Sequence, residues 1–399
     1  MNKLAIKGGS ATRTHDFTAR RTMGDTEKKA VMEVMESGEL SGFFGSPGPQ
    51  WLGGEKVKQF ERKWADNYGY KHAISVNSWT TGLMTAVGAM GIGPGDEVIV
   101  SPYTMSASAT AILFYGGIPV FVDIDPKTYN ICPEAVESSV TSRTRAILPV
   151  HLFGQCAAMD EIAAIAKKHD LPVIEDAAQA IGAEYLGRPA GSWGDIGCLS
   201  FYPTKNLGGM GDGGMMVCND LEMAAKLRLL ASHGMQPRYY HKLVGINSRL
   251  DTIQAAILNV KIAHLQSYSD ARQKNANRYA ELFAASGLTQ WFALPYHAPE
   301  ALHVWNQYGI RVPDGMRDSL RKHLSDMGIG NEVYYPVPLH QQECFRDLGY
   351  TDGCLPQTEK AAKEILHLPI YPDLTESEQD AVVNEIQRFY ASASLRRAA

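Results

Sequence analysis

Short apolar runs alternate with amphipathic stretches between about residues 70 and 220, and this alternation limits the possible folds more than any other feature of the sequence. Each run is largely apolar throughout, as expected for a strand of a parallel sheet that is covered on both faces. The clearest strand candidates are Ala73–Val76, Glu97–Val100, Pro119–Val122, Ala146–Val150 and Pro172–Ile174. Helical patterns lie between them, from near Thr81 to Gly91 or Gly93 and from Met159 to His169. The pattern predicts an α/β fold whose mostly parallel sheet is flanked by helices.

The pattern changes after Arg249. Long helical stretches run from Leu250 to about Leu265 and from Asp270 to Ala285, and strand-like runs follow at Tyr308–Val312 and Glu332–Tyr335. We therefore predict a large α/β domain over residues 1–265 and a smaller C-terminal α+β domain over residues 266–399.

The segment before the alternating block predicts one helix and one long loop. Asp25 offers an N-cap and Gly38 a C-terminal stop, with Val31, Met32 and Met35 expected in the core. The loop from Ser41 to Gly54 is rich in Gly, Pro and Trp, and both a functional role and a plain surface connection are open for it.

Charge and hydropathy bear on the partners of the chain. The 38 Lys and Arg and 43 Asp and Glu residues give a formal net charge of −5 without a block of like charge, unlike a general nucleic-acid binder. The uncharged run Val98–Val122 is interrupted by Pro102, Gly116-Gly117 and Pro119, so it predicts strand, helix and strand instead of a membrane span. The N-terminus lacks a signal-type apolar region, and we expect a cytoplasmic protein.

The six cysteines show no C-x-x-C pair and no grouping with histidine. We therefore expect reduced thiols, and the sequence predicts no metal site.

A lysine in a glycine-rich loop is the most informative local feature. Lys205 lies between the strand-like runs Cys198–Tyr202 and Met215–Cys218, in the stretch Ser200–Gly214. Partial burial lowers the pKa of a lysine amine and frees it as a nucleophile, so Lys205 is a candidate Schiff-base residue. A solvated surface lysine is the alternative.

The same loop carries the letters of a dinucleotide-binding motif at Gly209, Gly211 and Gly214. That motif must open a helix, whereas a strand-like Met-Met-Val-Cys follows here. We therefore do not expect NAD binding at this loop.

Two further motifs fall where the fold places ligands, at the carboxyl ends of strands. Asp176 ends the run that begins at Val173, where an aspartate can keep a pyridine nitrogen protonated and so support pyridoxal phosphate chemistry; an N-cap is the alternative. The stretch Val76–Gly82 passes from strand to helix with several hydroxyls, a possible phosphate cradle or simply a cap.

With these motifs the sequence resembles the DegT/StrS sugar aminotransferases, fold-type-I pyridoxal-phosphate enzymes of the aspartate aminotransferase superfamily. The resemblance runs from about Leu4 to Phe389. Its marks are Gly93-Pro-Gly-Asp-Glu-Val-Ile-Val, Asp123-Ile-Asp-Pro, Pro149-Val-His-Leu-Phe-Gly, Glu175-Asp-Ala-Ala-Gln, Ser200-Phe-x-x-x-Lys205, Asn247-x-Arg-Leu-Asp and Ile253-Gln-Ala-Ala. It implies an aspartate aminotransferase-like large domain with a sheet of the seven-stranded type.

The resemblance also implies a cofactor, pyridoxal 5'-phosphate, and roles for three residues. Lys205 is the Schiff-base lysine and moves a proton between substrate and cofactor. Asp176 pairs with the pyridine nitrogen, and Gln179 lies near the ring hydroxyl.

Four more positions match contacts to the cofactor phosphate. Thr80, the backbone after Trp79, and Ser200 come from the same chain, while Asn247 reaches the phosphate from the neighbouring subunit. The resemblance therefore implies a homodimer with shared active sites.

The ring-stacking position departs from the family pattern. The family has an aromatic residue where this chain has Met105; a thioether can also pack on a ring, and Tyr103 is nearby. Tyr335 and His340 match substrate-pocket positions. His151 is a further substrate candidate or a core histidine.

The implied reaction is ping-pong transfer of an amino group from L-glutamate or L-glutamine to a keto sugar. The Lys205 loop resembles members that aminate 3-keto nucleotide-linked sugars, with 4-keto sugars as an option. The stretch Leu4–Arg13 instead resembles members acting on keto-cyclitols of aminoglycoside pathways, so the acceptor stays open.

Three alternative functions make different demands on these residues. Related sugar dehydratases replace the lysine by histidine, which Lys205 contradicts. A metal-dependent glycosyltransferase would use Asp123 and Asp125 as a D-x-D pair, although Pro126 favours a simple turn. A regulator that has lost catalysis is the third, and the intact Lys205 and Asp176 speak against it.

Overall fold

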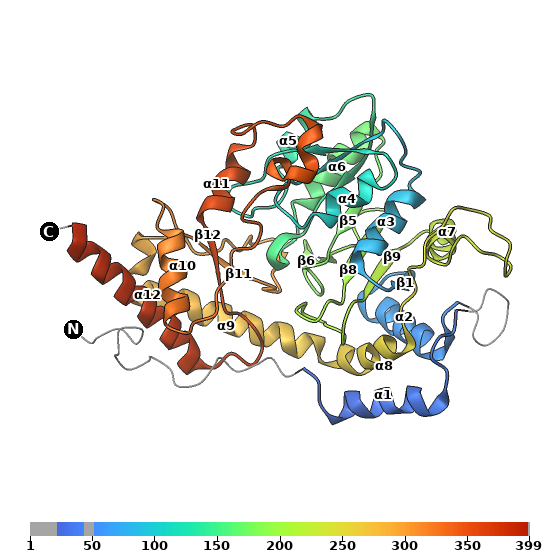
Figure 1. Ribbon diagram of the computed structural model, residues 1–399, viewed down its shortest axis with the longest axis horizontal. Coiled ribbons are helices and arrows are strands. Elements are labelled where there is room, and N and C mark those ends of the chain that lie inside the picture. Colours follow the sequence, from blue (N-terminus) through green and yellow to red (C-terminus); the bar gives the residue numbers. More distant parts are fainter. Residues whose placement is uncertain (1–21, 44–51, 398–399) are drawn as a thin grey trace.

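The computed structural model describes residues 22–43 and 52–397, and its centre is one twisted sheet (Figure 1). Parallel bridges from Ile147 to Val173 and from Val150 to Asp176 join a four-stranded and a three-stranded sheet into seven strands. In spatial order these are β1 (His72–Val76), β9 (Gly214–Cys218), β8 (Ile196–Ser200), β5 (Ile174–Asp176), β4 (Thr144–Leu148), β2 (Glu97–Val100) and β3 (Ile118–Phe121). Of the seven, β9 alone runs in the direction opposite to the other six. The predicted α/β class with a mostly parallel sheet is confirmed.

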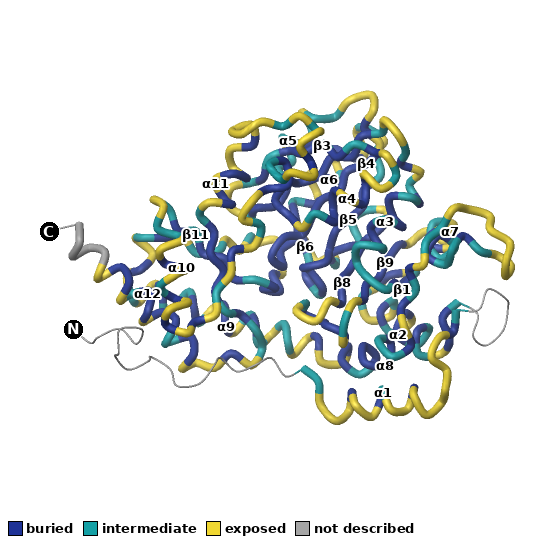
Figure 2. The backbone as a smooth tube through the Cα atoms, viewed as in Figure 1, coloured by how far each residue is buried: buried dark blue, intermediate teal, exposed yellow. Residues whose placement is uncertain are grey.

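Helices cover both faces of this sheet, because successive strand residues point to opposite sides. In β2, Val98 and Val100 enter one hydrophobic cluster and Ile99 enters another. The first cluster is closed by α3 (Trp79–Ala89), α4 (Ala107–Leu113) and α7 (Leu221–Ala231); the second by α2 (Gly54–Tyr68), α6 (Met159–His169) and α8 (Thr252–Lys261). Figure 2 shows the sheet as the buried centre of the molecule.

The predicted strands and helices of this part overlap the observed ones. The bounds of β2 and α6 are as predicted, and the run Val98–Val122 forms β2, α4 and β3. Ala146–Val150 was expected where Thr144–Leu148 is the strand, because pairing with β2 ends at Leu148 while the apolar run continues to Val150, which makes only an isolated bridge to Asp176.

Other elements outside the large sheet include two helices, a second small sheet and short 3-10 turns. They are α1 (Asp25–Ser37), α5 (Pro133–Ser138), the three-stranded sheet of β6 (Glu184–Tyr185), β7 (Arg188–Pro189) and β10 (Ala301–Leu302), and short 3-10 turns at Leu152–Gly154, Ile262–His264 and Leu288–Gln290.

The C-terminal part builds a third hydrophobic cluster around a two-stranded antiparallel sheet. Its elements are α9 (Leu265–Ala285), β11 (Tyr308–Arg311), α10 (Arg317–Asp326), 3-10 turns η5 (Leu339–Gln341) and η6 (Glu343–Leu348), α11 (Pro356–Glu364), β12 (Ile365–Leu368) and α12 (Glu376–Arg397). Part of this region packs elsewhere: Leu339, Phe345 and Leu355 belong to the first cluster, against the large sheet.

The strand expected at Glu332–Tyr335 is wrong. Glu332 makes an isolated bridge to His367, but Tyr335 has a left-handed backbone with φ of 57° and Pro336 follows it. Neither feature suits a continuing strand. The partner of β11 is instead β12, which the sequence analysis did not predict.

Two expectations for α1 are also wrong. Gly24, not Asp25, is the N-cap, and its N–H donates to the Glu27 carboxylate. Met32 and Met35 are 49% and 57% exposed, because the face that packs on α8 carries Ala30 and Val34.

The domain boundary at residues 265/266 stays a prediction; it coincides with the start of α9. The Ser41–Gly54 loop lies mostly outside the described residues, as does the Leu4–Arg13 stretch. Within the described part of the chain, no helix is both long and apolar enough to cross a membrane.

Candidate active site

Three sequence motifs meet at one edge of the large sheet. The parallel strands β1, β8 and β5 end there at Val76, Ser200 and Asp176. Gly214, the first residue of β9, pairs with both Val76 and Ser200, so the Lys205 loop leaves and re-enters the sheet at this edge. Carboxyl ends of strands are where open α/β sheets bind ligands.

The start of α3 forms one wall of this edge. Ser78 is its N-cap and accepts a hydrogen bond from the Thr81 N–H at 3.2 Å. The N–H groups of Trp79 and Thr80 belong to the first turn, where a helix supplies no acceptor of its own. Gly214 lies so close that a Cβ there would sit 2.7 Å from the Trp79 nitrogen. Glycine thus keeps the space in front of this helix end open for an anion.

Asp176 is fully buried at the end of β5. Its Oδ2 accepts a hydrogen bond from the Ser108 hydroxyl at 2.8 Å and its Oδ1 one from the Ala178 N–H at 3.2 Å. Burial raises the pKa of this carboxyl to about 6, and these hydrogen bonds, Lys205 and His151 oppose the rise. A carboxylate held this way favours a positive charge placed next to it.

Burial also shifts the pKa of Lys205, in the opposite direction. Burial lowers the pKa of its amine to about 8, and the negative charge of Asp176 partly opposes this. Its backbone N–H donates to the Tyr202 carbonyl at 2.9 Å, within a turn so tight that a Cβ at Gly208 would overlap the Pro203 carbonyl. More of the amine is therefore neutral near neutral pH than in a solvated lysine.

The glycines of this loop lead into a strand. Gly214 opens β9 and no helix follows it there, which agrees with the rejection of a dinucleotide site.

A second lysine, Lys261, supports the Lys205 loop. Lys261 of α8 is fully buried, and its ammonium donates to the Gly208 carbonyl and, at 2.9 Å, to the Thr22 hydroxyl. No sequence motif singles out this residue; the available signal is a lone lysine at the end of the apolar helix α8.

Gln179 and Tyr335 connect the edge to the C-terminal part. The Gln179 side chain accepts from the Phe153 N–H at 2.7 Å and donates to the Tyr335 hydroxyl at 2.7 Å. The Tyr335 ring packs edge-on against Tyr103, with 5.8 Å between ring centroids. Tyr335 therefore lies at the site, near enough to Asp176 for that charge to raise the pKa of its hydroxyl further after burial.

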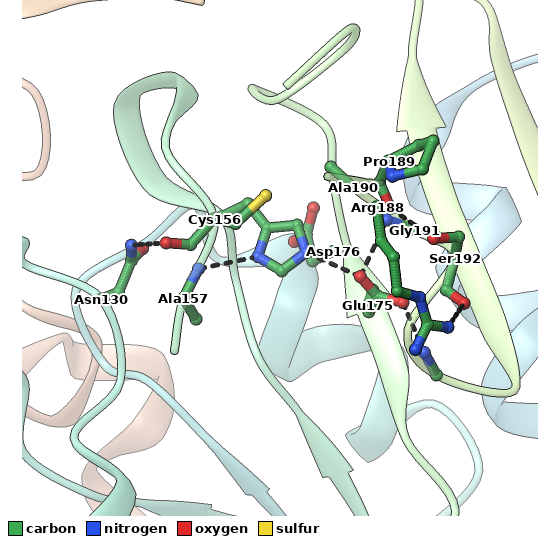
Figure 3. Close-up of polar contacts among 12 residues, drawn as sticks. Asn130, Cys156, Ala157, Glu175, Asp176, Arg188, Pro189, Ala190, Gly191 and Ser192 are labelled. Atoms are coloured by element: carbon green, nitrogen blue, oxygen red, sulfur yellow. Dashed lines mark hydrogen bonds and ion pairs between the residues drawn. The ribbon is translucent and has the colours of Figure 1, made fainter. Parts of the chain in front are cut away.

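Glu175 lies in a buried polar network (Figure 3), and the hydrogen bond from His151 makes His151 a member of it. Its Nδ1 accepts the Ala157 N–H at 3.2 Å, so Nε2 carries the proton that it donates to Glu175 at 2.8 Å. Glu175 also accepts the Gly191 and Gly194 N–H groups at 2.8 and 2.6 Å. Both ring nitrogens of His151 are used inside the protein, an arrangement that does not favour the substrate contact predicted for it.

The remaining predicted residues lie as follows. Ser200 is buried and its hydroxyl accepts the Tyr202 N–H at 3.3 Å. Met105 is 52% exposed. The Asn247 side chain accepts from Arg249 at 2.9 Å, and its carbonyl accepts from the Asn77 side chain beside α3. His340 is buried and contacts Glu359. Their predicted roles stay predictions.

Asp123 and Asp125 are occupied by hydrogen bonds of the chain itself. Asp123 accepts from Gln357 N, Thr358 N and the Thr358 hydroxyl, all at the start of α11. Asp125 accepts from Lys127 N, Thr128 N and the Thr128 hydroxyl in its own turn. The D-x-D pair is therefore structural, and the structure gives the glycosyltransferase interpretation no support.

Pyridoxal 5'-phosphate fits this set of groups. The site combines an amine made more nucleophilic by burial, a buried carboxylate that favours an adjacent positive charge, and a helix start that favours a phosphate. The indole Nε1 of Trp79 and the hydroxyl of Tyr103 are buried and make no hydrogen bond within the described residues.

Fold and site together define a pyridoxal-phosphate aminotransferase of the aspartate aminotransferase type. The sequence profile of the DegT/DnrJ/EryC1/StrS aminotransferase family matches residues 23–387, and the chain belongs to that family. Its cofactor is pyridoxal 5'-phosphate.

Individual relatives carry different names. A "Pleiotropic regulatory protein" of Geobacillus stearothermophilus is 49% identical over 84% of this chain and 90% of that protein. A UDP-N-acetyl-3-dehydro-alpha-D-glucosamine 3-aminotransferase of Acidithiobacillus ferrooxidans is 43% identical over 84% of this chain and 89% of that protein. The crystal structure of S. venezuelae DesV in complex with a ketimine intermediate is 38% identical, covers 91% of this chain and 94% of DesV, and has a TM-score of 0.84.

Proposed function

We propose that this protein transfers an amino group from L-glutamate or L-glutamine to the 3-keto group of a nucleotide-linked sugar. The burial of Lys205 and Asp176 at the carboxyl edge of the sheet carries this proposal, because burial lowers the pKa of the lysine toward neutrality and makes the buried carboxylate favour an adjacent positive charge. A relative that is 43% identical, named for a 3-dehydro UDP-sugar, supports the acceptor class.

In this proposal Lys205 has two tasks. Its neutral amine would hold the cofactor covalently, and the same Nζ would accept and return the proton at the reacting carbon of the substrate. A lysine with a pKa near 8 can hold a proton and release it near neutral pH. When bound, pyridoxal 5'-phosphate supplies an electron sink for that proton transfer.

Asp176 keeps the pyridine nitrogen of the cofactor protonated. Its carboxylate is positioned by the Ser108 hydroxyl, which also contacts the Thr104 hydroxyl at 3.2 Å. Trp79, Thr80 and Ser200 hold the phosphate at the start of α3, Gln179 lies near the ring hydroxyl, and Met105 packs on the ring.

The acceptor sugar is proposed to lie against Tyr335, whose hydroxyl is fixed by Gln179. The predicted homodimer is retained, with Asn247 of each chain reaching the phosphate of the other. Exposed apolar side chains in the 239–244 segment, at Tyr239, Tyr240 and Val244, support burial against a second copy. All six cysteines are free, which supports the predicted cytoplasmic location.

An absorption experiment tests the donor half of the reaction. The purified protein with pyridoxal 5'-phosphate should show the visible band of a lysine-bound cofactor, and L-glutamate alone should convert it to the pyridoxamine spectrum. Lys205→Arg should fold and lose both the band and turnover, whereas Lys167→Arg on the exposed face of α6 should behave as the parent.

The acceptor half is tested by supplying keto compounds to the pyridoxamine form. Return of the band with a 3-keto UDP- or dTDP-sugar supports the proposal, while a response restricted to 4-keto sugars or keto-cyclitols would reassign the acceptor. A protein that binds no cofactor would favour the regulatory interpretation suggested by the name of the 49% identical relative.

A further inference from the structure

Three residues with metal-binding side chains meet in the C-terminal part, where sequence analysis expected no metal site. His340 lies in η5, Cys354 in the turn before α11, and Glu359 within α11. One ligand atom of each lies within 4.8 Å of the other two. The fold creates this cluster, since the sequence separates His340 from Cys354 by the whole of η6.

The distance between His340 and Glu359 is long for an ion pair. His340 Nε2 and Glu359 Oε1 are 3.3 Å apart, longer than the roughly 2.7–2.9 Å of a charge-assisted hydrogen bond. Two ligand atoms each about 2.0–2.1 Å from a tetrahedral ion are roughly 3.3 Å apart, so this spacing suits a shared ion.

Glu359 has a further hydrogen bond, whereas the Nδ1 atom of His340 has no partner within the described residues. The Glu359 carboxylate accepts the Gly353 N–H at 2.7 Å, which holds the adjacent residue Cys354 against it. The His340 imidazole is fully buried, and its Nδ1 makes no hydrogen bond within the described residues. Nε2, the ring nitrogen that faces Glu359, is the atom that would take the ion.

We propose that His340, Cys354 and Glu359 bind one divalent cation of the Zn²⁺ type. Imidazole nitrogen, thiolate sulfur and carboxylate oxygen are the zinc ligands of proteins, and three protein ligands leave a fourth position for water. Cys354 is exposed, so an ion can enter from solvent, while the other two ligands are buried. On binding, the Cys354 thiol releases its proton to solvent and its sulfur takes the metal in exchange.

The cation would brace a segment that reaches the active site. Residues 335–359 begin at Tyr335, which contacts Gln179, and continue through Leu339, whose N–H donates to the Pro102 carbonyl at 2.9 Å. Tyr350 of the same segment accepts the Phe121 N–H at 2.7 Å. A metal that ties His340 to the start of α11 therefore stabilises this wall without contacting the Lys205–Asp176 pair.

The test uses the holoenzyme, stripped with a chelator that is then removed by dialysis, with Zn²⁺ or Co²⁺ alone as the probe. We expect one tightly bound Zn²⁺ per chain by calorimetry and elemental analysis, and a rise in melting temperature on adding Zn²⁺. Bound Co²⁺ should give a thiolate-to-metal absorption band. Cys354→Ser should abolish that band and weaken Zn²⁺ binding at least tenfold.

Cys344→Ser is the matched control, because Cys344 is the other exposed cysteine and lies outside the cluster. It should leave metal binding unchanged. Glu359→Gln is the second variant: it keeps an oxygen acceptor for Gly353 but removes the negative ligand, so Zn²⁺ binding should weaken while the cofactor spectrum is retained. Absence of Zn²⁺ binding to the parent, or equal binding by parent and Cys354→Ser, would overturn the proposal.

Discussion

Asp123 links the large sheet to α11, and its replacement gives a quantitative test of how the C-terminal part is attached. The helix α11 lacks a cap of its own: its N-cap position is Leu355, and Pro356 at the first helical position has no N–H. The Asp123 carboxylate, 234 and 235 residues away in sequence, takes the next two N–H groups and the Thr358 hydroxyl.

The cost of Asp123→Ala follows from the three donors of α11 that it leaves behind. Thr358 is fully buried, so its N–H and hydroxyl lose a partner with little access to water, at about 1–3 kcal/mol each. Gln357 is exposed, and water can replace the carboxylate there. We expect the free energy of unfolding to fall by about 2–4 kcal/mol. Asp123→Asn keeps one oxygen for Thr358 and should cost about 1 kcal/mol.

Urea denaturation of the holoenzyme, followed by tryptophan fluorescence, measures these changes from the shift of the midpoint. Asp66→Ala, at an exposed position of α2, is the control and should change stability by less than about 0.5 kcal/mol. A loss below about 0.5 kcal/mol for Asp123→Ala would refute the capping argument. A Mn²⁺-dependent glycosyl transfer abolished by the same variant would refute the structural interpretation of the D-x-D pair.

Three more predictions follow from buried charges near the site. Lys205→Met should stabilise the cofactor-free protein at pH 7 by up to about 3 kcal/mol, because the buried amine has a folded pKa near 8 against 10.5 in the unfolded chain. This advantage should vanish as the pH rises from 8 to 10.5. A difference in thermal unfolding that does not depend on pH would contradict the prediction. Glu175→Gln must point an NH₂ at a backbone N–H of Gly191 or Gly194, so the free energy of unfolding in urea should fall by about 1–3 kcal/mol. No measurable fall would show that these hydrogen bonds do not stabilise the fold. Lys261→Met leaves the Gly208 carbonyl without its buried donor and should weaken retention of pyridoxal 5'-phosphate about tenfold in equilibrium dialysis, with circular dichroism unchanged; unaltered retention would remove Lys261 from the support of the Lys205 loop.

The sequence predicts the large sheet well for a physical reason. Strands buried on both faces are largely apolar, and this leaves short apolar runs such as Val98–Val100 of β2 that the sequence alone reveals. The motif residues at strand ends could be placed together because parallel strands share one carboxyl edge.

What escaped prediction depends on contacts between distant segments. The pairing of β12 with β11 and the left-handed turn at Tyr335 are set by packing that no local pattern encodes. The exposure of Met32 and Met35 depends on which face of α1 meets α8. The support of the Lys205 loop by Lys261 and the cluster of His340, Cys354 and Glu359 likewise arise only once the chain is folded.

The pairing of β1 with β9 has a consequence for how the chain is made. β1 ends at residue 76, yet its sheet partner ends at residue 218, so 142 residues must leave the ribosome before the two strands can meet. At about 5–20 residues per second this takes roughly 7–30 s. In that interval the apolar β1 can pack only on segments that are already made, such as α3 and α2, whose Glu61 carboxylate accepts the Ser75 N–H and hydroxyl. A nascent chain that stalls before Gly214 would therefore present an unpaired β1 edge to chaperones and to other nascent chains.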